Sequence, residues 1–257
     1  MEYFLICLVA FLASILTFFS GFGLGTILMP VFALFFPVEI AIALTGVVHF
    51  FNNIFKLILV GKNANKSVFI YFGIPAILAA FLGAWVLLNI TELEPIYQYG
   101  IGLKIYEVTA VNLIIAVLLI IFAVLELLPF LKRLEFKKKM LPFGGFLSGF
   151  FGGLSGHQGA LRSAFLIKAG LTKEAFIGTA VVISCLVDFS RLSMYATRML
   201  ESGLDENISL IVSATVTAMA GALLGRRLLK KVTLDFLQKI VAIMLILISI
   251  ALGMGLI

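Results

Sequence analysis

Apolar runs of about 20 residues recur along the whole chain, and they constrain its fold more than any other feature of the sequence. A helix of that length spans the roughly 30 Å of hydrocarbon in a bilayer. Of the residues, 62% are hydrophobic and only 12% are charged, whereas soluble domains carry roughly 25%. The sequence therefore predicts an all-α integral membrane protein, surrounded by the lipid bilayer.

Four of the predicted membrane segments are short, and they form two pairs, each interrupted by glycines. The interruptions read FFSGFGLG (18–25) and GGLSGHQG (152–159). The second member of each pair, with about 13 residues at 1.5 Å rise, reaches only about 20 Å. Each pair is therefore predicted to be a re-entrant hairpin. All the predicted segments are 4–20, 24–36, 38–60, 67–89, 105–128, 141–154, 158–170, 174–197, 208–229 and 235–256.

The two halves of the chain match when the sequence is shifted by 135 positions. Glu39 then falls on Glu174 and Lys56 on Arg191, which indicates an internal duplication. A hairpin plus three full crossings makes an odd number, so the second repeat is predicted to be inverted, as in secondary transporters. The predicted units are a first membrane repeat, a basic cytoplasmic linker and a second membrane repeat, at 1–130, 131–140 and 141–257.

Loop charges predict the orientation of both repeats. GKNANK (61–66) and RRLLKK (226–231) are basic and are predicted to be cytoplasmic, whereas NITELEP (89–95) and MLESGLDEN (199–207) are acidic and predicted to be external. Both termini are then external in a multi-pass protein of the cell membrane, and the first apolar run is a membrane segment rather than a cleaved signal peptide. Because the basic clusters lie at segment ends, they predict no nucleic-acid partner.

One predicted helix, 38–60, carries a polar face inside the membrane. Its members are spaced i, i+3, i+4 and i+7, so they share one side of the helix. The 135-residue shift places a second polar face in the other half. The first face comprises His49, Asn52, Asn53 and Lys56, and the second Ser184, Val187, Asp188 and Arg191.

The charges within the membrane segments are mostly positive. The positive residues are Lys56, Arg162 and Arg191, and the negative residue is Asp188. A charged side chain at mid-membrane costs at least about 2.5 to 3.5 kcal/mol, and such residues usually face an interior cavity. The centre of the protein is therefore predicted to bind an anion.

The second glycine turn supplies further anion-binding groups. Its glycines allow the backbone to break, and the break exposes amide donors at the start of a half-helix. Arg162, one turn into that half-helix, offers a planar donor fork. Ser155, His157 and Gln158 add donors that fix the orientation of the anion.

Structural alternatives remain for several of these residues. The glycines also suit a surface where helices pack closely. Asp188 and Arg191, at i and i+3, also suit an internal ion pair, and Asp188 alone suits a proton carrier. His49 also suits a packing role, and Lys56 could extend its amine to the cytoplasmic water.

The run SGFGLGTILMPVFALFF with GIPAILAAFLGAWV resembles the first half of the sulfite exporter TauE/SafE family, also called the sulfonate uptake permeases. FGGLSGHQGALRSAFLIKAGLTKEAFIGTAVVI resembles the second repeat of that family, and the resemblance covers about residues 4–256. The first turn departs from the family's glycine-rich run at Phe22 and Leu24. The resemblance implies a secondary transporter of sulfur-containing anions such as sulfite, sulfoacetate or other organosulfonates. It implies site residues at Ser20, Gly21, Gly23, Gly25, Ser155, Gly156, His157, Gln158, Gly159 and Arg162.

The residues and the resemblance together predict an exporter with one central site for a small anionic organosulfur substrate, with a proton as one possible coupling ion. No cofactor, metal or catalytic group is predicted. An anion channel, or an uptake permease for another small anion, is the alternative. A membrane enzyme with His49 or His157 as general base is disfavoured, since no histidine pair has metal-ligand spacing. The substrate-binding residues are the ten named above together with His49, Asn52, Asn53, Lys56, Asp188 and Arg191.

Overall fold

The computed structural model describes residues 1–18, 23–102, 104–127, 138–167, 169–201, 207–228 and 234–257. Ser20, Gly21 and most of the 131–140 linker lie outside these residues. In chain order, the helices and strands are α1 (Glu2–Thr17), α2 (Leu24–Ala33), α3 (Val38–Val60), η1 (Gly61–Asn63), α4 (Lys66–Val68), η2 (Phe69–Gly73), α5 (Ile74–Thr91), β1 (Tyr97–Ile101), β2 (Lys104–Val108), α6 (Ala110–Leu127), η4 (Lys138–Met140), α7 (Leu141–Ser155), α8 (Gly159–Ile167), α9 (Lys173–Glu201), α10 (Ile208–Leu228) and α11 (Leu234–Gly253).

Every predicted membrane segment contains a helix, which confirms the helical membrane fold. Four helical stretches in the described part of the chain are long and apolar enough to cross a bilayer. The shorter apolar helices include α1 and α2. At 1.5 Å per residue, the 10 residues of α2 and the 9 of α8 reach only about 15 Å each. The four spanning candidates are Val38–Asn63, Lys66–Thr91, Lys173–Ala196 and Ile208–Arg226.

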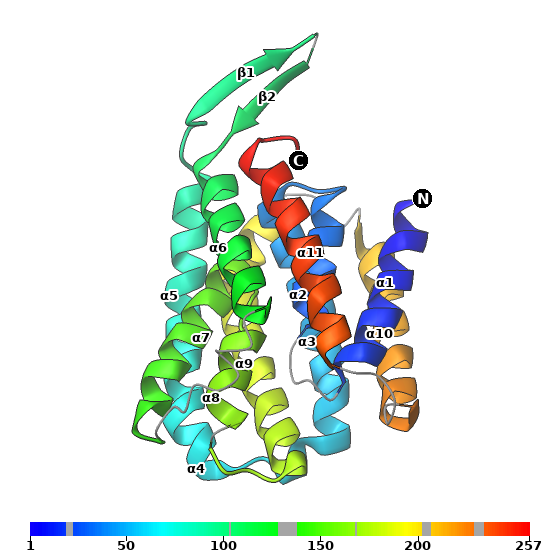
Figure 1. Ribbon diagram of the computed structural model, residues 1–257, viewed down its shortest axis with the longest axis vertical. Helices are drawn as coiled ribbons and strands as arrows, with labels where there is room; N and C mark the ends of the chain where they lie inside the picture. Colours follow the sequence, from blue (N-terminus) through cyan, green and yellow to red (C-terminus); the bar gives the residue numbers. More distant parts are fainter. Residues whose placement is uncertain (19–22, 103, 128–137, 168, 202–206, 229–233) are drawn as a thin grey trace.

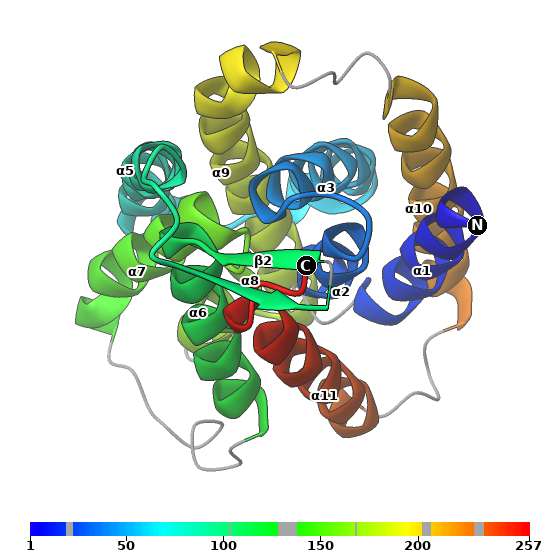
Figure 2. The ribbon, with the colours of Figure 1, turned by 90° about the horizontal axis from the view of Figure 1, so that it is seen from above.

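Three helix pairs form the periphery of the bundle. α1 packs against α10, α5 against α7, and α6 against α11. Viewed from above, these pairs surround α2, α3 and α8 (Figure 2). The long helix α9 packs against α3 and also contacts α5 and α8. Polar side chains on α3, α8 and α9 can therefore meet inside the bundle.

The two chain termini and the hairpin of β1 and β2 lie at one end of the molecule, and α4 lies at the other (Figure 1). The hairpin was not predicted, because its apolar residues were assigned to the start of the segment 105–128; the helix instead begins at Ala110. The strands are antiparallel, with Tyr99 opposite Tyr106. Alternating Tyr and Ile favour a strand, and Gly102, with φ 62, permits the turn.

The segment predicted as one helix at 67–89 contains a π-helical stretch at Phe69–Gly73. Pro75 follows this stretch in the first turn of α5. Proline has no backbone N–H, so it removes one donor from the helical ladder. The wider π-helical turn beside Pro75 lets the neighbouring backbone N–H and C=O groups keep hydrogen-bond partners, so the helix continues past the proline.

Glycines bring α7 into very close contact with η2 and α5, which follow one another in the chain. A Cβ on Gly145, Gly149 or Gly153 would clash with a backbone carbonyl oxygen across the interface. The three glycines recur every four residues, so they form one stripe along α7. α10 uses Gly221 and Gly225 in the same way against the backbone of α1. Small residues permit this approach where lipid provides no hydrophobic drive for helix association.

We expect Gly149→Ala to destabilise the protein by about 1–3 kcal/mol or more, because its Cβ would meet the backbone of Ala76 and the helices must separate. Thermal unfolding of the purified protein in detergent measures the loss. Gly253→Ala is the matched control. Its Cβ would lie 3.6 Å from that of Ala116, an ordinary contact, so stability should hold or rise slightly. Equal stability of both variants would contradict close packing at the α5–α7 contact.

Candidate functional site

The start of α2 and the end of α7 lie beside each other inside the bundle. α2 starts at the N-cap Gly23, with φ 115, and α7 ends at Gly156, with φ 79. Only glycine adopts such angles without strain, so the sequence fixes both breaks. A Cβ on Gly25 would lie 3.7 Å from the carbonyl oxygen of Gly156. The first turn of α2 therefore adjoins the end of α7, and Gly159 starts α8 after two further residues.

Asp188 on α9 is fully buried and joins side chains from α3, from α9 and from the turn between α7 and α8. Its Oδ2 lies 2.6 Å from His49 Nδ1 and accepts a hydrogen bond from Asn53 Nδ2 at 3.3 Å. Its Oδ1 accepts from Arg191 Nε at 3.0 Å and from Gln158 Nε2 at 3.4 Å. The polar face of α3 thus meets α9 and the start of α8 at one carboxylate.

Arg191 forms the internal ion pair that its spacing from Asp188 allows, with its Nη2 2.9 Å from Asp188 Oδ1. Its guanidinium also lies beside two glycines. A Cβ on Gly46 would be 3.2 Å from Arg191 Cζ, and one on Gly156 would be 2.9 Å from Nη1. Within the described part of the chain, Nη1 is buried without a hydrogen-bond partner. This donor is therefore available beside the α7 break.

A small cavity lies between the α1–α2 break and the polar residues of α3, α8 and α9. Lys56 and Arg162, both buried, contribute its cationic groups. Lys56 Nζ lies 5.5 Å from the centre of the Phe18 ring, and Arg162 Nη1 donates to Gln158 Oε1 at 3.0 Å. The lining comprises Thr17, Phe18, Leu24, His49, Asn53, Lys56, Arg162, Val181 and Ser184.

Positive charge exceeds negative charge in this region. Among the described residues, the buried charged side chains are Lys56, Arg162, Arg191 and Asp188. With histidine neutral, they leave two positive charges in excess. Buried charge is costly unless it is compensated, so the arrangement favours an anionic ligand. Lys56 lines the cavity and is 6% exposed, so its amine does not extend into cytoplasmic water.

Several predicted site residues do not line the cavity. Ser155 Oγ donates to Phe151 O within α7, at 3.0 Å. His157 donates through Nδ1 to Ser155 O at 2.8 Å and stacks on Phe122. Asn52 faces the other way from Asn53 and accepts from Ser14 of α1 at 3.5 Å. The other predicted site residues outside the lining are Gly23, Gly25, Gly156, Gln158, Gly159, Asp188 and Arg191, whereas Ser20 and Gly21 lie outside the described residues.

The sequence did not single out Thr17 and Phe18 as site residues. The available signal was their position directly before the first glycine run, because residues at the end of a helix that stops inside the bundle lie next to the interruption. Ser184 lies on the predicted polar face of α9, one turn before Asp188, and it lines the cavity. Among the described residues, no group of three or more His, Cys, Asp or Glu side chains is arranged to hold a metal ion.

The chain matches a family model described as Sulfite exporter TauE/SafE over residues 6–252, nearly its whole length. It therefore belongs to this family. Comparison with curated proteins and with solved structures finds no match. Membership makes the protein a membrane transporter of a sulfite- or sulfonate-related family.

We expect Asp188→Asn to lower the free energy of unfolding by about 3–5 kcal/mol, because it leaves Arg191 buried with an uncompensated charge. Chemical or thermal unfolding measures the change. Glu174→Gln, at an exposed position, should alter stability by less than about 0.5 kcal/mol. Asp188→Asn/Arg191→Gln should recover part of the loss, since neither charge then remains. If Asp188→Asn unfolds like the wild type, the carboxylate does not hold these helices together.

Proposed function

We propose that this member of the TauE/SafE family is a secondary transporter that exports sulfur-containing anions, such as sulfite, sulfoacetate or other organosulfonates, across the cell membrane. The observation that carries the proposal is the cavity between the hairpin breaks, where Lys56 and Arg162 are both buried. A positive cavity inside a membrane bundle suits an anion in transit. The protein acts as a carrier, not as an enzyme.

The two halves, 1–130 and 141–257, are proposed to be inverted repeats joined by the cytoplasmic linker 131–140. The helix contacts support this reading, because exchanging the halves maps the most extensive contacts onto one another or onto themselves. α1 with α10 becomes α7 with α5, and α2 with α3 becomes α8 with α9. The contacts of α3 with α9 and of α6 with α11 map onto themselves. Each repeat then comprises a re-entrant hairpin, α1–α2 or α7–α8, and three crossing helices.

The end that carries both termini is proposed to be external. The acidic loop 89–95 precedes the β1–β2 hairpin at this end. The basic loop 61–66 lies beside α4 at the opposite end (Figure 1). Basic residues concentrate on the cytoplasmic side of membrane proteins. α1–α2 then enters from outside and α7–α8 from the cytoplasm, so their breaks meet near the middle of the membrane.

The cavity is proposed to bind the oxygen atoms of a sulfite or sulfonate group. Lys56 and Arg162 neutralise its charge, and the planar fork of Arg162 suits an oxyanion. Asn53 and Ser184 offer further donors from α3 and α9. His49 donates through Nδ1 to Asp188, which leaves Nε2 as an acceptor and fixes the ring. These residues come from both repeats, so the affinity for the anion depends on how the two repeats are placed relative to each other.

Asp188, Arg191 and Gln158 are proposed to position the binding residues. Gln158 joins Arg162 to Asp188, and Asp188 holds His49 and Asn53. Rocking one repeat against the other would change these contacts while the anion stays between them. Ser155 and His157, which do not line the cavity, support the end of α7 through their hydrogen bonds to Phe151 O and Ser155 O. Asn52 supports α3 against α1.

Ligand-dependent thermal stability tests the site. We expect one anion among sulfite, sulfoacetate, taurine, thiosulfate, sulfate and chloride to stabilise the wild type by about 2.7 kcal/mol at 100 times its dissociation constant. Arg162→Ala and Lys56→Met should abolish the shift. Lys62→Met, which removes an exposed lysine nearby, should retain it. A shift that survives in both cavity variants moves the site elsewhere, and no shift with any anion removes the support for anion binding.

Flux in proteoliposomes tests the mechanism. A carrier should show saturable sulfite efflux, and unlabelled substrate on the opposite side should accelerate exchange of labelled substrate. Loss of flux in Arg162→Ala, with Lys62→Met active, ties transport to the cavity. A pH gradient that drives accumulation identifies a coupling proton. Non-saturating flux without acceleration indicates an anion channel, and conversion of substrate without a gradient indicates an enzyme.

A further inference from the structure

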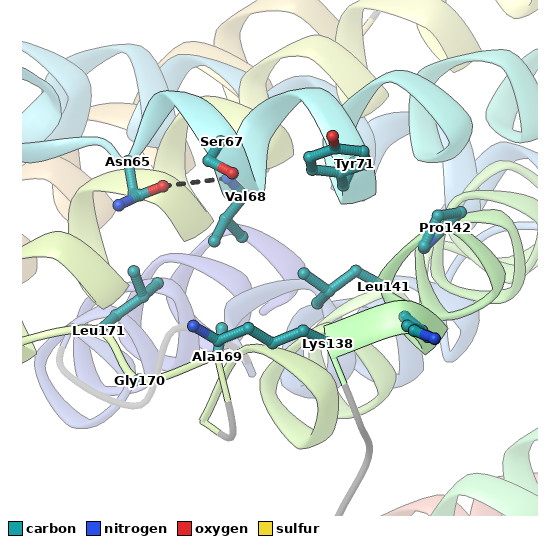
Figure 3. Close-up of a pocket in the computed structure, with 11 residues that line it drawn as sticks. Asn65, Ser67, Val68, Tyr71, Lys138, Leu141, Pro142, Ala169, Gly170 and Leu171 are labelled. Atoms are coloured by element: carbon teal, nitrogen blue, oxygen red, sulfur yellow. Dashed lines mark hydrogen bonds between the residues drawn. The ribbon is translucent and has the colours of Figure 1, made fainter.

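A groove lies at the end of the bundle opposite the termini, and it shares no lining residue with the central cavity. It forms where α4 and η2 approach the start of α7 and the turn after α8, and its volume is about 530 Å³ (Figure 3). We call it the α4–α7 groove. Its lining comprises Asn65, Ser67, Val68, Tyr71, Lys138, Lys139, Leu141, Pro142, Ala169, Gly170 and Leu171.

The polar lining of the α4–α7 groove is basic. Lys138 and Lys139 are both exposed, and Ser67 adds a hydroxyl group. In Figure 3 the side chain of Lys138 extends along the groove towards Ala169. No acidic side chain is among the described residues that line it. Two amines without a neighbouring carboxylate in the lining favour a negatively charged group.

The remaining lining is apolar and continues into the lipid-facing surface. Val68, Leu141 and Leu171 form part of the wall. Beside the groove residues Tyr71 and Pro142 along the same segments, Ile74 on α5 is 44% exposed and Phe143 on α7 is 55% exposed. Exposed apolar side chains on spanning helices face acyl chains. The groove therefore joins a positive mouth to an apolar surface.

The position of the groove matches the boundary between headgroups and hydrocarbon. The candidate spanning stretch that begins at Lys66 starts at this groove. Tyr71, 58% exposed, lines the groove one turn further in, where amphipathic aromatic residues are enriched. A ligand here therefore contacts both the polar and the apolar region of the bilayer.

We propose that the α4–α7 groove binds an anionic phospholipid. The lipid phosphate contacts the amines of Lys138 and Lys139, and Ser67 and Asn65 contact the glycerol or headgroup oxygens. An acyl chain runs over Ile74 and Phe143. Basic pockets between membrane helices hold anionic headgroups in this way. A soluble phosphate would match the lysines but leave the apolar surface unused. The proposal is independent of the transported anion.

Thermal stability of delipidated protein, titrated with phosphatidylglycerol or phosphatidylcholine, tests the proposal. Phosphatidylglycerol should raise the unfolding temperature more than phosphatidylcholine. Lys138→Gln/Lys139→Gln should weaken the apparent affinity for phosphatidylglycerol about tenfold or more. Lys62→Gln/Lys66→Gln removes two exposed lysines at the same end that do not line the groove, and it should bind like the wild type.

Three outcomes would overturn the proposal. The first is an equal response to the two lipids, and the second is an equal loss of affinity in both double variants. The third is a stabilisation by inorganic phosphate that Lys138→Gln/Lys139→Gln removes, since the ligand would then be a soluble anion. If Lys138→Gln/Lys139→Gln unfolds on purification, Lys138→Arg/Lys139→Arg serves instead and should retain phosphatidylglycerol. Native mass spectrometry should then show bound phosphatidylglycerol, and its absence would contradict the proposal.

Discussion

The burial of one carboxylate organises the centre of this protein. Asp188 has no exposed surface, and its oxygens contact side chains of α3, of α9 and of the turn between α7 and α8. A buried charge in a membrane protein must find partners within the bundle, since lipid offers none. These partners tie the first half of the chain to the second. The cavity that Lys56 and Arg162 line depends on this arrangement, because His49, Asn53 and Gln158 are held by Asp188.

Close backbone approach provides the second constraint. The glycine stripe of α7 brings its backbone against α5, and Gly221 and Gly225 bring α10 against α1. Each of these contacts fixes the helix before a glycine interruption, α1 or α7, against a long apolar helix of the other half. This packing consequently holds the breaks at Gly23 and Gly156 in place. The glycines at the breaks themselves are needed because their φ angles are positive. The same residue type thus has two physical roles within one helix.

The sequence predicted the helices well, because hydropathy and glycine position are local signals. The two polar faces that the sequence indicated, on α3 and α9, contact each other in the structure through His49, Asn53 and Asp188. The pattern did not separate Asn52 from Asn53, which are about 100° apart on the helix and face different partners. The i, i+3 spacing allowed the ion pair of Arg191 with Asp188, but the contacts of Asp188 with His49 and Gln158 join distant parts of the chain, which no local pattern encodes. The β-hairpin was missed because its apolar residues extend the next membrane segment.

The excess of positive charge at the centre links the proposed transport cycle to the membrane potential. Lys56, Arg162, Arg191 and Asp188 carry two net positive charges before an anion binds. Moving one elementary charge through 100 mV involves about 2.3 kcal/mol. In a cell with a negative interior, the field draws an empty positive site towards the cytoplasm, where an exporter loads its substrate. An anion of matching charge would cancel this force. The membrane potential would then assist the return of the empty carrier and have almost no effect on the movement of the loaded carrier.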